Sequence, residues 1–336
     1  MAISAYPSVG TTEWNDLASA YFRKSIFNTP RDNFYKKHPA LVWFRKNQAT
    51  QDTAAKWTWP VFNGNVSQGR SYIGAQGHTP VRVNVATTAE QDCAFFAEPI
   101  FITHTDQERA KGNGKTFDLL EAHKKDAMLR LTAKHSSYMF AATQVTATDP
   151  LSVRLAIPID PTADVAFNLL NGAAAKQPFW RNQTQTCTGS WATSGINKLD
   201  AGLNDMAEEA GDPDILVTTK AVFQFIQQQQ RGHLSIQRST TETAKTMGDL
   251  GIPMLYHAGI PIVHDSDCTA GVIYGLKADA IKWNANSGGD YVLYGDGFES
   301  TMINGVLGSL AYIRLEGNLC VYERRALLQV DAISAA

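Results

Sequence analysis

The most regular pattern in this chain is a period-two alternation of hydrophobic positions between residues 57 and 85. Two segments show it, one containing Trp57, Trp59 and Val61 and the other Val81, Val83 and Val85. This alternation is typical of half-buried strands. The residues between the two segments include Gly64, Gly69, Gly74 and Gly77. The pattern therefore predicts one long β-hairpin with a glycine-rich tip.

This predicted hairpin has no obvious partner within the chain. An isolated two-stranded hairpin is only marginally stable in water, so its apolar face needs a cover. We therefore expect another copy of the same protein to cover it.

Helical periodicity is clearest in two parts of the chain. The pattern in residues 1–50 predicts a helical arm, and the longest uninterrupted helix is expected over 116–141, with Thr116 as its N-cap. At 3.6 residues per turn, one face of this long helix holds Leu120, Ala127, Leu131 and Tyr138. We expect that face to be buried.

The rest of the chain mixes helices and strands. One helix is expected from Thr193 or Ser194 to the Gly211–Pro213 break, with its buried face formed by Ile196, Leu199, Leu203, Met206 and Ala207. A buried strand over 215–217 precedes a helix from Thr219 that buries Val222, Phe223 and Ile226. Further strands are expected at 260–263, 272–276, 291–294, 310–315 and 319–322. Because there is no regular βαβ alternation, the predicted fold class is α+β.

The last two of these strands flank Glu316, Gly317 and Asn318, which the composition of the segment predicts to form a turn. The chain is therefore expected to end in a β-hairpin.

Composition narrows the function classes. The 336 residues are 44% hydrophobic and carry a formal net charge of -2, which argues against a dedicated nucleic-acid binder with a basic surface. No signal peptide is recognisable at the start, and no apolar run approaches the roughly 18 residues of a membrane span. The four cysteines are far apart, which indicates reduced core thiols and synthesis in a reducing cytoplasm.

The sequence lacks the phosphate-binding G-x-x-x-x-G-K-[ST] motif and the G-x-S-x-G motif of hydrolases. One group of side chains could hold a divalent metal: His257, His264, Asp265, Asp267 and Cys268. We interpret these residues as a polar turn that closes the strand 260–263, because no second motif supplies further ligands or a general base. We therefore expect no catalytic residue, cofactor or metal, and a metal-dependent enzyme remains a distant alternative.

Residues 199–214 carry six acidic residues and no Lys or Arg, among them Asp205, Glu208 and Glu209. The simpler interpretation is a solvated helix face. The more specific one is a docking surface for a basic element of a neighbouring subunit, such as Arg70 or Arg82 in the hairpin.

The order of these elements, together with six short sequence blocks, resembles the major capsid proteins of tailed bacteriophages, which have the Hong Kong 97-type fold. The blocks span residues 39–325 and occur in the family's order. They are Pro39–Lys46, Thr105–Gly114, Phe179–Asn182, Pro213–Thr219, Gly259–Cys268 and Gly317–Arg325.

The resemblance implies five parts: an N-terminal arm (1–50), an extended E-loop hairpin (51–110), a peripheral domain with the long spine helix (111–190), an axial domain (191–288) and C-terminal strands of the peripheral domain (289–336). It implies a structural function, in which pentamers and hexamers of the chain assemble into an icosahedral shell around the phage genome. The protein would then reside in the virion, after assembly in the host cytoplasm.

The resemblance also assigns residues to surfaces. The expected subunit interface contains Trp57, Trp59, Gly64, Gly69, Arg70, Gly74, Gly77, Arg82, Asp205, Glu208 and Glu209. A weak, unspecific contact with packaged double-stranded DNA is expected from Arg109, Lys111, Lys115, Lys124, Lys125, Arg130 and Lys134. These seven basic residues face only three acidic ones over 109–134, so we expect the polar side of the spine helix to look inward.

Further partners follow from the same resemblance. Only about 50 residues precede the hairpin, which leaves no room for a fused scaffolding domain, so a separate scaffolding protein is expected. A portal and a decoration protein are the other partners of such shells. The nearest alternative is an encapsulin-like compartment, which shares the fold but encloses cargo enzymes.

Overall fold

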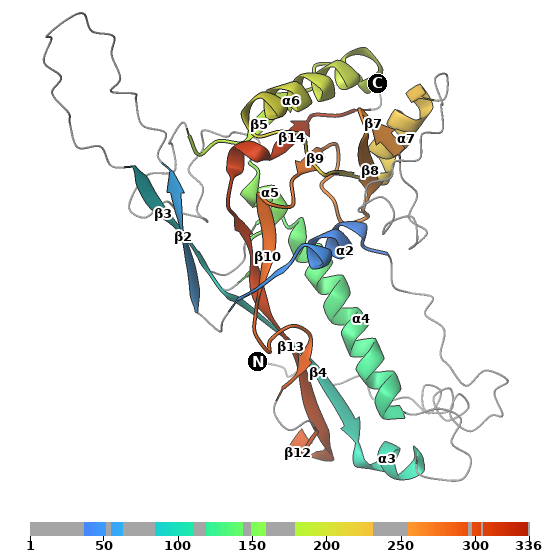
Figure 1. Cartoon of the computed structure of the whole chain (residues 1–336). Helices are drawn as coiled ribbons and strands as arrows, with labels where there is room; N and C mark the ends of the chain where they lie inside the picture. The colour runs from blue at the N-terminus through green and yellow to red at the C-terminus, as the bar shows by residue number, and fades with distance from the viewer. Residues whose placement is uncertain are drawn as a thin grey trace, which may run out of the picture. The chain divides into compact units, whose positions relative to one another are not determined.

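The computed structural model describes residues 37–51, 55–62, 85–110, 119–143, 149–158, 179–230, 255–294, 298–303 and 305–334 (Figure 1). It confirms a mixed helix and sheet fold. The helical segments are α2 (Pro39–Lys46), α3 (His104–Ala110), α4 (Leu119–Met139), α5 (Val153–Ala156), the π-helical turn η1 (Trp191–Gly195), α6 (Ile196–Glu209), α7 (Lys220–Gln230) and the 3₁₀ turn η2 (Arg324–Ala326). The strands are β1 (Ala49–Gln51), β2 (Lys56–Phe62), β3 (Ala86–Asp92), β4 (Ala94–Thr103), β5 (Gln183–Thr186), β6 (Ile215–Thr218), β7 (Leu255–His257), β8 (Ile260–His264), β9 (Ile273–Leu276), β10 (Ile281–Asn286), β11 (Val292–Leu293), β12 (Glu299–Ile303), β13 (Val306–Val321) and β14 (Leu328–Asp331).

The described residues form two compact units. One contains 96–133 and 291–315, and the other contains 37–95, 134–290 and 316–334. In the smaller unit, β11 and β12 pair antiparallel with the first part of β13, and β4 pairs with β13 as well.

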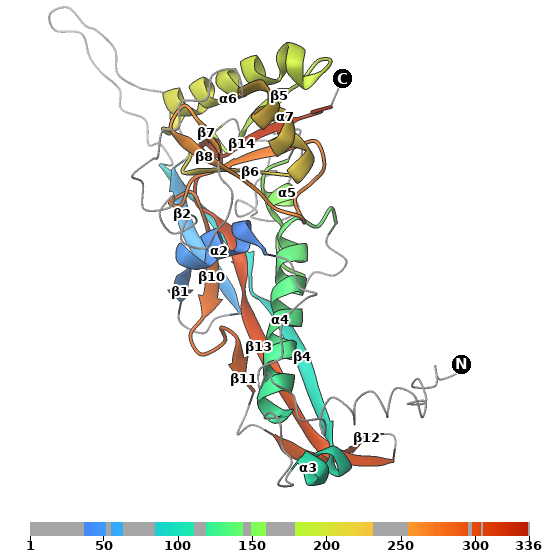
Figure 2. The same ribbon diagram turned by 90° about the vertical axis from the view of Figure 1, so that its right-hand side faces the viewer.

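The larger unit contains a six-stranded sheet with the order β5-β14-β9-β6-β8-β7. Strand β6 runs parallel to β8 and antiparallel to β9, and all four of its residues are buried, as its continuous apolar run predicts. Helices α6 and α7 lie on this sheet (Figure 2), and both contribute to one hydrophobic cluster with alternate strand residues. That cluster includes Leu199, Leu203, Phe223, Ile226, Leu216, Ile262 and Leu328.

Most of the residues predicted to form the buried face of α6 are buried in the structure. Leu199, Leu203 and Met206 are buried, whereas Ala207 is exposed, so its predicted burial is wrong. The helical path begins earlier than expected, with the π-helical turn that starts at Trp191. At Gly202 the helix comes close to β14, since a Cβ there would lie 2.6 Å from the Leu328 side chain.

Helix α4 matches the predicted long helix in position. Ala127 and Leu131 are buried as expected, and Tyr138 is half-buried. Thr116 lies outside the described residues, and so does the Leu120 side chain. The last turns of α4, which belong to the larger unit, bury His135 against Trp283 of β10, with 4.3 Å between the ring centroids.

The predicted turn at 316–318 is wrong, because β13 continues through it as one strand from Val306 to Val321. In the larger unit, Gly317 pairs with Ala285 of β10 and Asn318 pairs with Asn284. A Cβ on Gly317 would lie 2.6 Å from the Asn284 carbonyl oxygen and 2.8 Å from Trp283 Nε1. Glycine is needed here because β10 and its tryptophan approach closely, not because the chain turns.

Gly317→Ala tests this close approach. We expect the variant to lower the free energy of unfolding by about 1–3 kcal/mol, because the added methyl group overpacks a buried strand pair. Denaturant unfolding of wild type and variant measures the difference. Ser309→Ala, a change in the same strand, should stay within about 0.5 kcal/mol of wild type. Equal stability of Gly317→Ala and wild type would contradict the packing described here.

His135 gives a pH-dependent prediction. Burial lowers its pKa from 6.5 to about 3, and the charge of Arg45 contributes in the same direction. Between these pH values the unfolded chain binds a proton at His135 that the folded chain does not, so stability falls as the pH falls below about 6.5.

We expect His135→Phe to remove this loss. In wild type the free energy of unfolding should decrease by up to about 1.4 kcal/mol per pH unit more than in the variant. The comparison is made by denaturant titration between pH 6.5 and 5, where most carboxylates remain charged in both proteins. Parallel pH profiles of the two proteins would show that His135 is not held neutral.

Candidate functional site

The base of the predicted hairpin is present. Strands β2 and β3 pair antiparallel, with Trp57 opposite Gln91 and Val61 opposite Thr87 (Figure 1). Buried and exposed residues alternate along β2 as the sequence predicts. Of the return strand, Val81 and Val83 lie outside the described residues, and Val85 is exposed just before β3.

The Trp57 and Trp59 side chains are already buried within their own chain. Each is only 8% exposed, and they pack in a cluster with Ala89, Trp180 and Cys320 of the same chain. The Trp59 ring lies 5.2 Å from the ring of Tyr322, between centroids. The expectation that the chain offers these two side chains no cover is therefore wrong.

A buried polar network fixes the ends of these strands. The Asn318 side chain donates to the Asp92 carbonyl oxygen at 2.7 Å, and its own oxygen accepts from the Leu151 backbone at 2.7 Å. Next to it, the Asn284 amide and the Tyr322 hydroxyl exchange hydrogen bonds. The side chains of Asn318, Asn284 and Tyr322 thus each have a hydrogen-bond partner, as is usual for buried polar groups.

Arg324 is a second buried polar anchor. Its guanidinium donates to the Trp180 carbonyl oxygen at 3.3 Å and to Asn182 Oδ1 at 3.4 Å. Burial lowers its pKa from 12.5 to about 10, which still leaves it charged at neutral pH. Two of the sequence blocks, 179–182 and 317–325, therefore contact each other inside one chain.

The acidic face of α6 is partly engaged within the chain. Asp205 accepts a hydrogen bond from Gln185, and Asp200 contacts His257 at 2.5 Å, whereas Glu208 and Glu209 are exposed. The predicted basic partners Arg70 and Arg82 lie outside the described residues, as do Gly64, Gly69, Gly74 and Gly77. The docking role of this face stays a prediction.

The basic residues of the spine helix have different surroundings. Lys125 and Lys134 are exposed, and Lys124 lies 5.6 Å from the Phe298 ring centroid. Arg130 forms ion pairs with Glu98 at 3.4 Å and Asp126 at 3.2 Å, so its charge is partly compensated. Lys111, Lys115 and the Arg109 side chain lie outside the described residues.

Large hydrophobic side chains are exposed in both units. In the smaller unit they lie on the C-terminal strands and next to them, and they include Tyr294, Met302, Val306, Leu307 and Tyr312. In the larger unit Phe62 is 78% exposed and Phe95 57%. Exposed apolar groups of this kind are common at protein–protein contacts.

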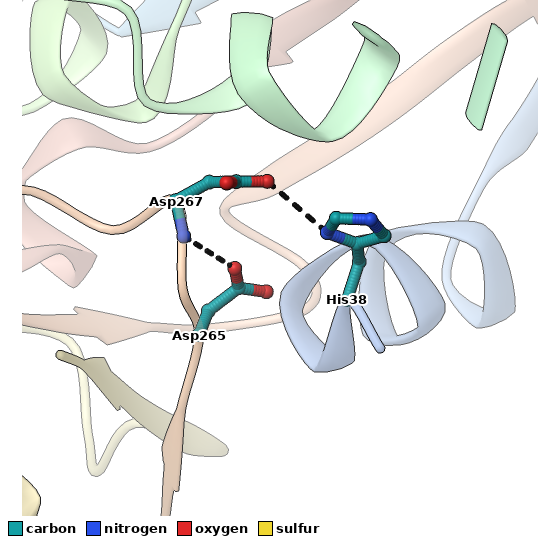
Figure 3. A group of neighbouring side chains, drawn as sticks. All are labelled: His38, Asp265 and Asp267. Carbon is teal, nitrogen blue, oxygen red and sulfur yellow. Dashed lines mark hydrogen bonds and ion pairs between the residues drawn. The ribbon is translucent and has the colours of Figure 1, made fainter. Parts of the chain in front are cut away.

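The five residues weighed in the sequence as a possible metal group do not come together at one point. His257 pairs with Asp200, and His264 packs on the Phe223 ring with 5.0 Å between centroids. Asp265 and Asp267 instead lie next to His38, at the start of α2 (Figure 3). His38 was missed because it lies far away in the sequence, and only the fold brings it to these carboxylates.

No protein-family model and no curated protein sequence matches the chain. Several solved structures do match it. Among them is the capsid asymmetric unit of cyanophage A-1(L), which is 14% identical with a TM-score of 0.65 and covers 93% of this chain and 96% of that chain. The capsid of a native GTA particle is 12% identical with a TM-score of 0.57, covering 98% and 100%.

A third match comes from a different kind of shell. The SrpI encapsulin complex from Synechococcus elongatus PCC 7942 is 11% identical with a TM-score of 0.58, covering 96% of each chain. Among the described residues no helix has the length and hydropathy of a membrane span. Since the matches extend over nearly the whole chain, the protein has the Hong Kong 97-type capsid fold.

Trp59→Ala tests whether the hairpin base is covered within one chain. We expect a loss of about 3–5 kcal/mol in the free energy of unfolding, because a buried aromatic side chain is removed. Phe62→Ala in the same strand is the matched control and should cost less than about 1 kcal/mol. Denaturant unfolding of unassembled protein gives both values. If the two variants were equally stable, Trp59 would lack the intrachain cover described here.

Proposed function

We propose that this chain is the major capsid protein of a tailed bacteriophage and assembles into an icosahedral shell. The observation that carries the proposal is the similarity to the cyanophage A-1(L) capsid subunit over 93% of this chain and 96% of that one. A match of both chains over nearly their full lengths indicates that the whole protein has the form of a shell subunit. In this proposal the role is structural, with no catalytic step.

The surface of the described residues supports assembly. Phe62, Phe95 and Met302 are more than half exposed, and burial of apolar area is a main driving force of association. Large obligate interfaces bury on the order of 2,000–5,000 Å². We propose that pentamers and hexamers of this chain cover these side chains, with Glu208 and Glu209 of one subunit facing the hairpin of the next.

We propose the same parts as the sequence predicts: an arm over 1–50, an E-loop over 51–110, peripheral segments over 111–190 and 289–336, and an axial domain over 191–288. Among the described residues of 51–110, β2 pairs with β3, whereas β4 pairs with β13. An E-loop that lies on a neighbour would then extend from a base that is fixed within its own subunit.

DNA contact in this proposal is weak and unspecific. The exposed Lys125 and Lys134 provide positive charge on α4. The Arg130 charge is shared with Glu98 and Asp126, so we expect Arg130 to contribute less than the two lysines. A separate scaffolding protein, a portal and a decoration protein are the proposed partners, with assembly in the host cytoplasm and the virion as final location.

An encapsulin-like compartment is the second candidate, because the SrpI encapsulin complex matches with a TM-score of 0.58 over 96% of each chain. The two functions differ in what the shell encloses. A phage capsid packages double-stranded DNA, whereas an encapsulin encloses a protein cargo.

Electron microscopy of the purified full-length chain tests the proposal. We expect closed icosahedral particles, or capsomers with five- and six-fold symmetry. Phe62→Ala should lower the assembled fraction, because it removes exposed apolar area, and Thr58→Ala on the same strand should not. A uniform monomer or dimer at all concentrations, also with a scaffolding partner, would contradict a shell function.

A further inference from the structure

His38, Asp265 and Asp267 form a compact cluster in the larger unit. One ligand atom from each lies within 4.8 Å of the other two. His38 is the residue before α2, and the two aspartates follow β8, so the cluster connects two segments far apart in the sequence (Figure 3).

One ring nitrogen of His38, Nδ1, is buried without a hydrogen bond among the described residues. The side chain is about nine-tenths buried, and Nδ1 forms an ion pair with Asp267 Oδ2 at 3.1 Å. Figure 3 shows the nitrogen on the side of the ring that faces the carboxylates. A buried imidazole nitrogen without a hydrogen bond is costly unless another atom satisfies it.

The two carboxylates are held in place by other groups. Asp265 accepts hydrogen bonds from the Ala40 backbone at 3.1 Å and the Asp267 backbone at 3.0 Å. Asp267 Oδ2 accepts from the Ser136 hydroxyl at 2.7 Å. Such outer hydrogen bonds orient ligating carboxylates in metal sites.

The charge balance of the cluster favours a cation. Asp265 is fully buried, and a carboxylate oxygen of Asp267 lies within 4.8 Å of one of its own. Two carboxylates close to one imidazole carry an excess of negative charge that a bound cation would compensate.

We propose that His38, Asp265 and Asp267 bind one divalent transition-metal ion that fixes the start of α2 to the loop after β8. One imidazole and two carboxylates suit Zn²⁺ or Mn²⁺, with water completing the coordination. This ion is structural, and the proposal does not depend on shell assembly.

Metal analysis of the full-length protein is the test. The protein is treated with chelator, exchanged into Zn²⁺ or Mn²⁺, freed of unbound ion and measured by mass spectrometry. We expect one ion per chain, and a higher thermal unfolding temperature than in the chelator-treated protein. Co²⁺ substitution should add a visible absorption band in wild type, which does not depend on any variant.

Three variants assign the site. His38→Gln and Asp267→Asn should each weaken binding at least about tenfold, since each removes one ligand. His257→Gln changes a His–Asp pair outside the cluster and should bind as wild type does. Asp265 is left unchanged, because its contact with Ala40 caps α2.

Absence of a stoichiometric ion would overturn the proposal. Full binding by His38→Gln, or equal loss in His257→Gln, would place the ion elsewhere and overturn it as well.

Discussion

The centre of the larger unit depends on the hydrogen bonds made by the Asn318 side-chain amide. From near the C-terminal end of β13 it binds the backbone of Asp92, at the end of β3, and that of Leu151, before α5. Its side-chain oxygen also accepts from the Leu319 backbone at 2.8 Å, and Asn318 is only 2% exposed, so loss of the amide would remove the partner of three backbone groups. An unpaired buried group costs about 1–3 kcal/mol. The hairpin base is therefore held by a specific polar contact as well as by its tryptophans.

Several of the sequence blocks that identify the fold contact one another within the chain. Ala40, in the first block, donates to Asp265 in the fifth. Arg324, in the last block, binds the backbone of Trp180 and the side chain of Asn182. These contacts lie within one chain and hold distant segments of it together. This explains why short blocks can indicate a fold at low overall identity.

The sequence predicts elements whose pattern is local. The strand with Trp57 and Trp59, the helix face with Leu199 and Met206 and the buried strand β6 follow from periodicity alone. Gly317 and Asn318 were misread as a turn because these residue types are common in turns. In the structure, glycine is needed at 317 because Trp283 lies so close, and the Asn318 side chain binds the Asp92 backbone. His38 was missed for the same reason. A contact between distant segments leaves no local signal, so neither the cover of the tryptophans nor the His38 cluster could be predicted.

The four cysteines have a consequence for the proposed shell. All of them are buried and free, and burial raises the pKa of Cys93 to about 11. At neutral pH such a thiol is thiolate in only about one molecule in ten thousand, and the thiolate is the form that oxidants attack. In the proposed shell, buried thiols of this kind would resist disulfide formation in aerated solution. The stability of such a shell in aerated solution would depend on the packing of its side chains and not on reducing agents.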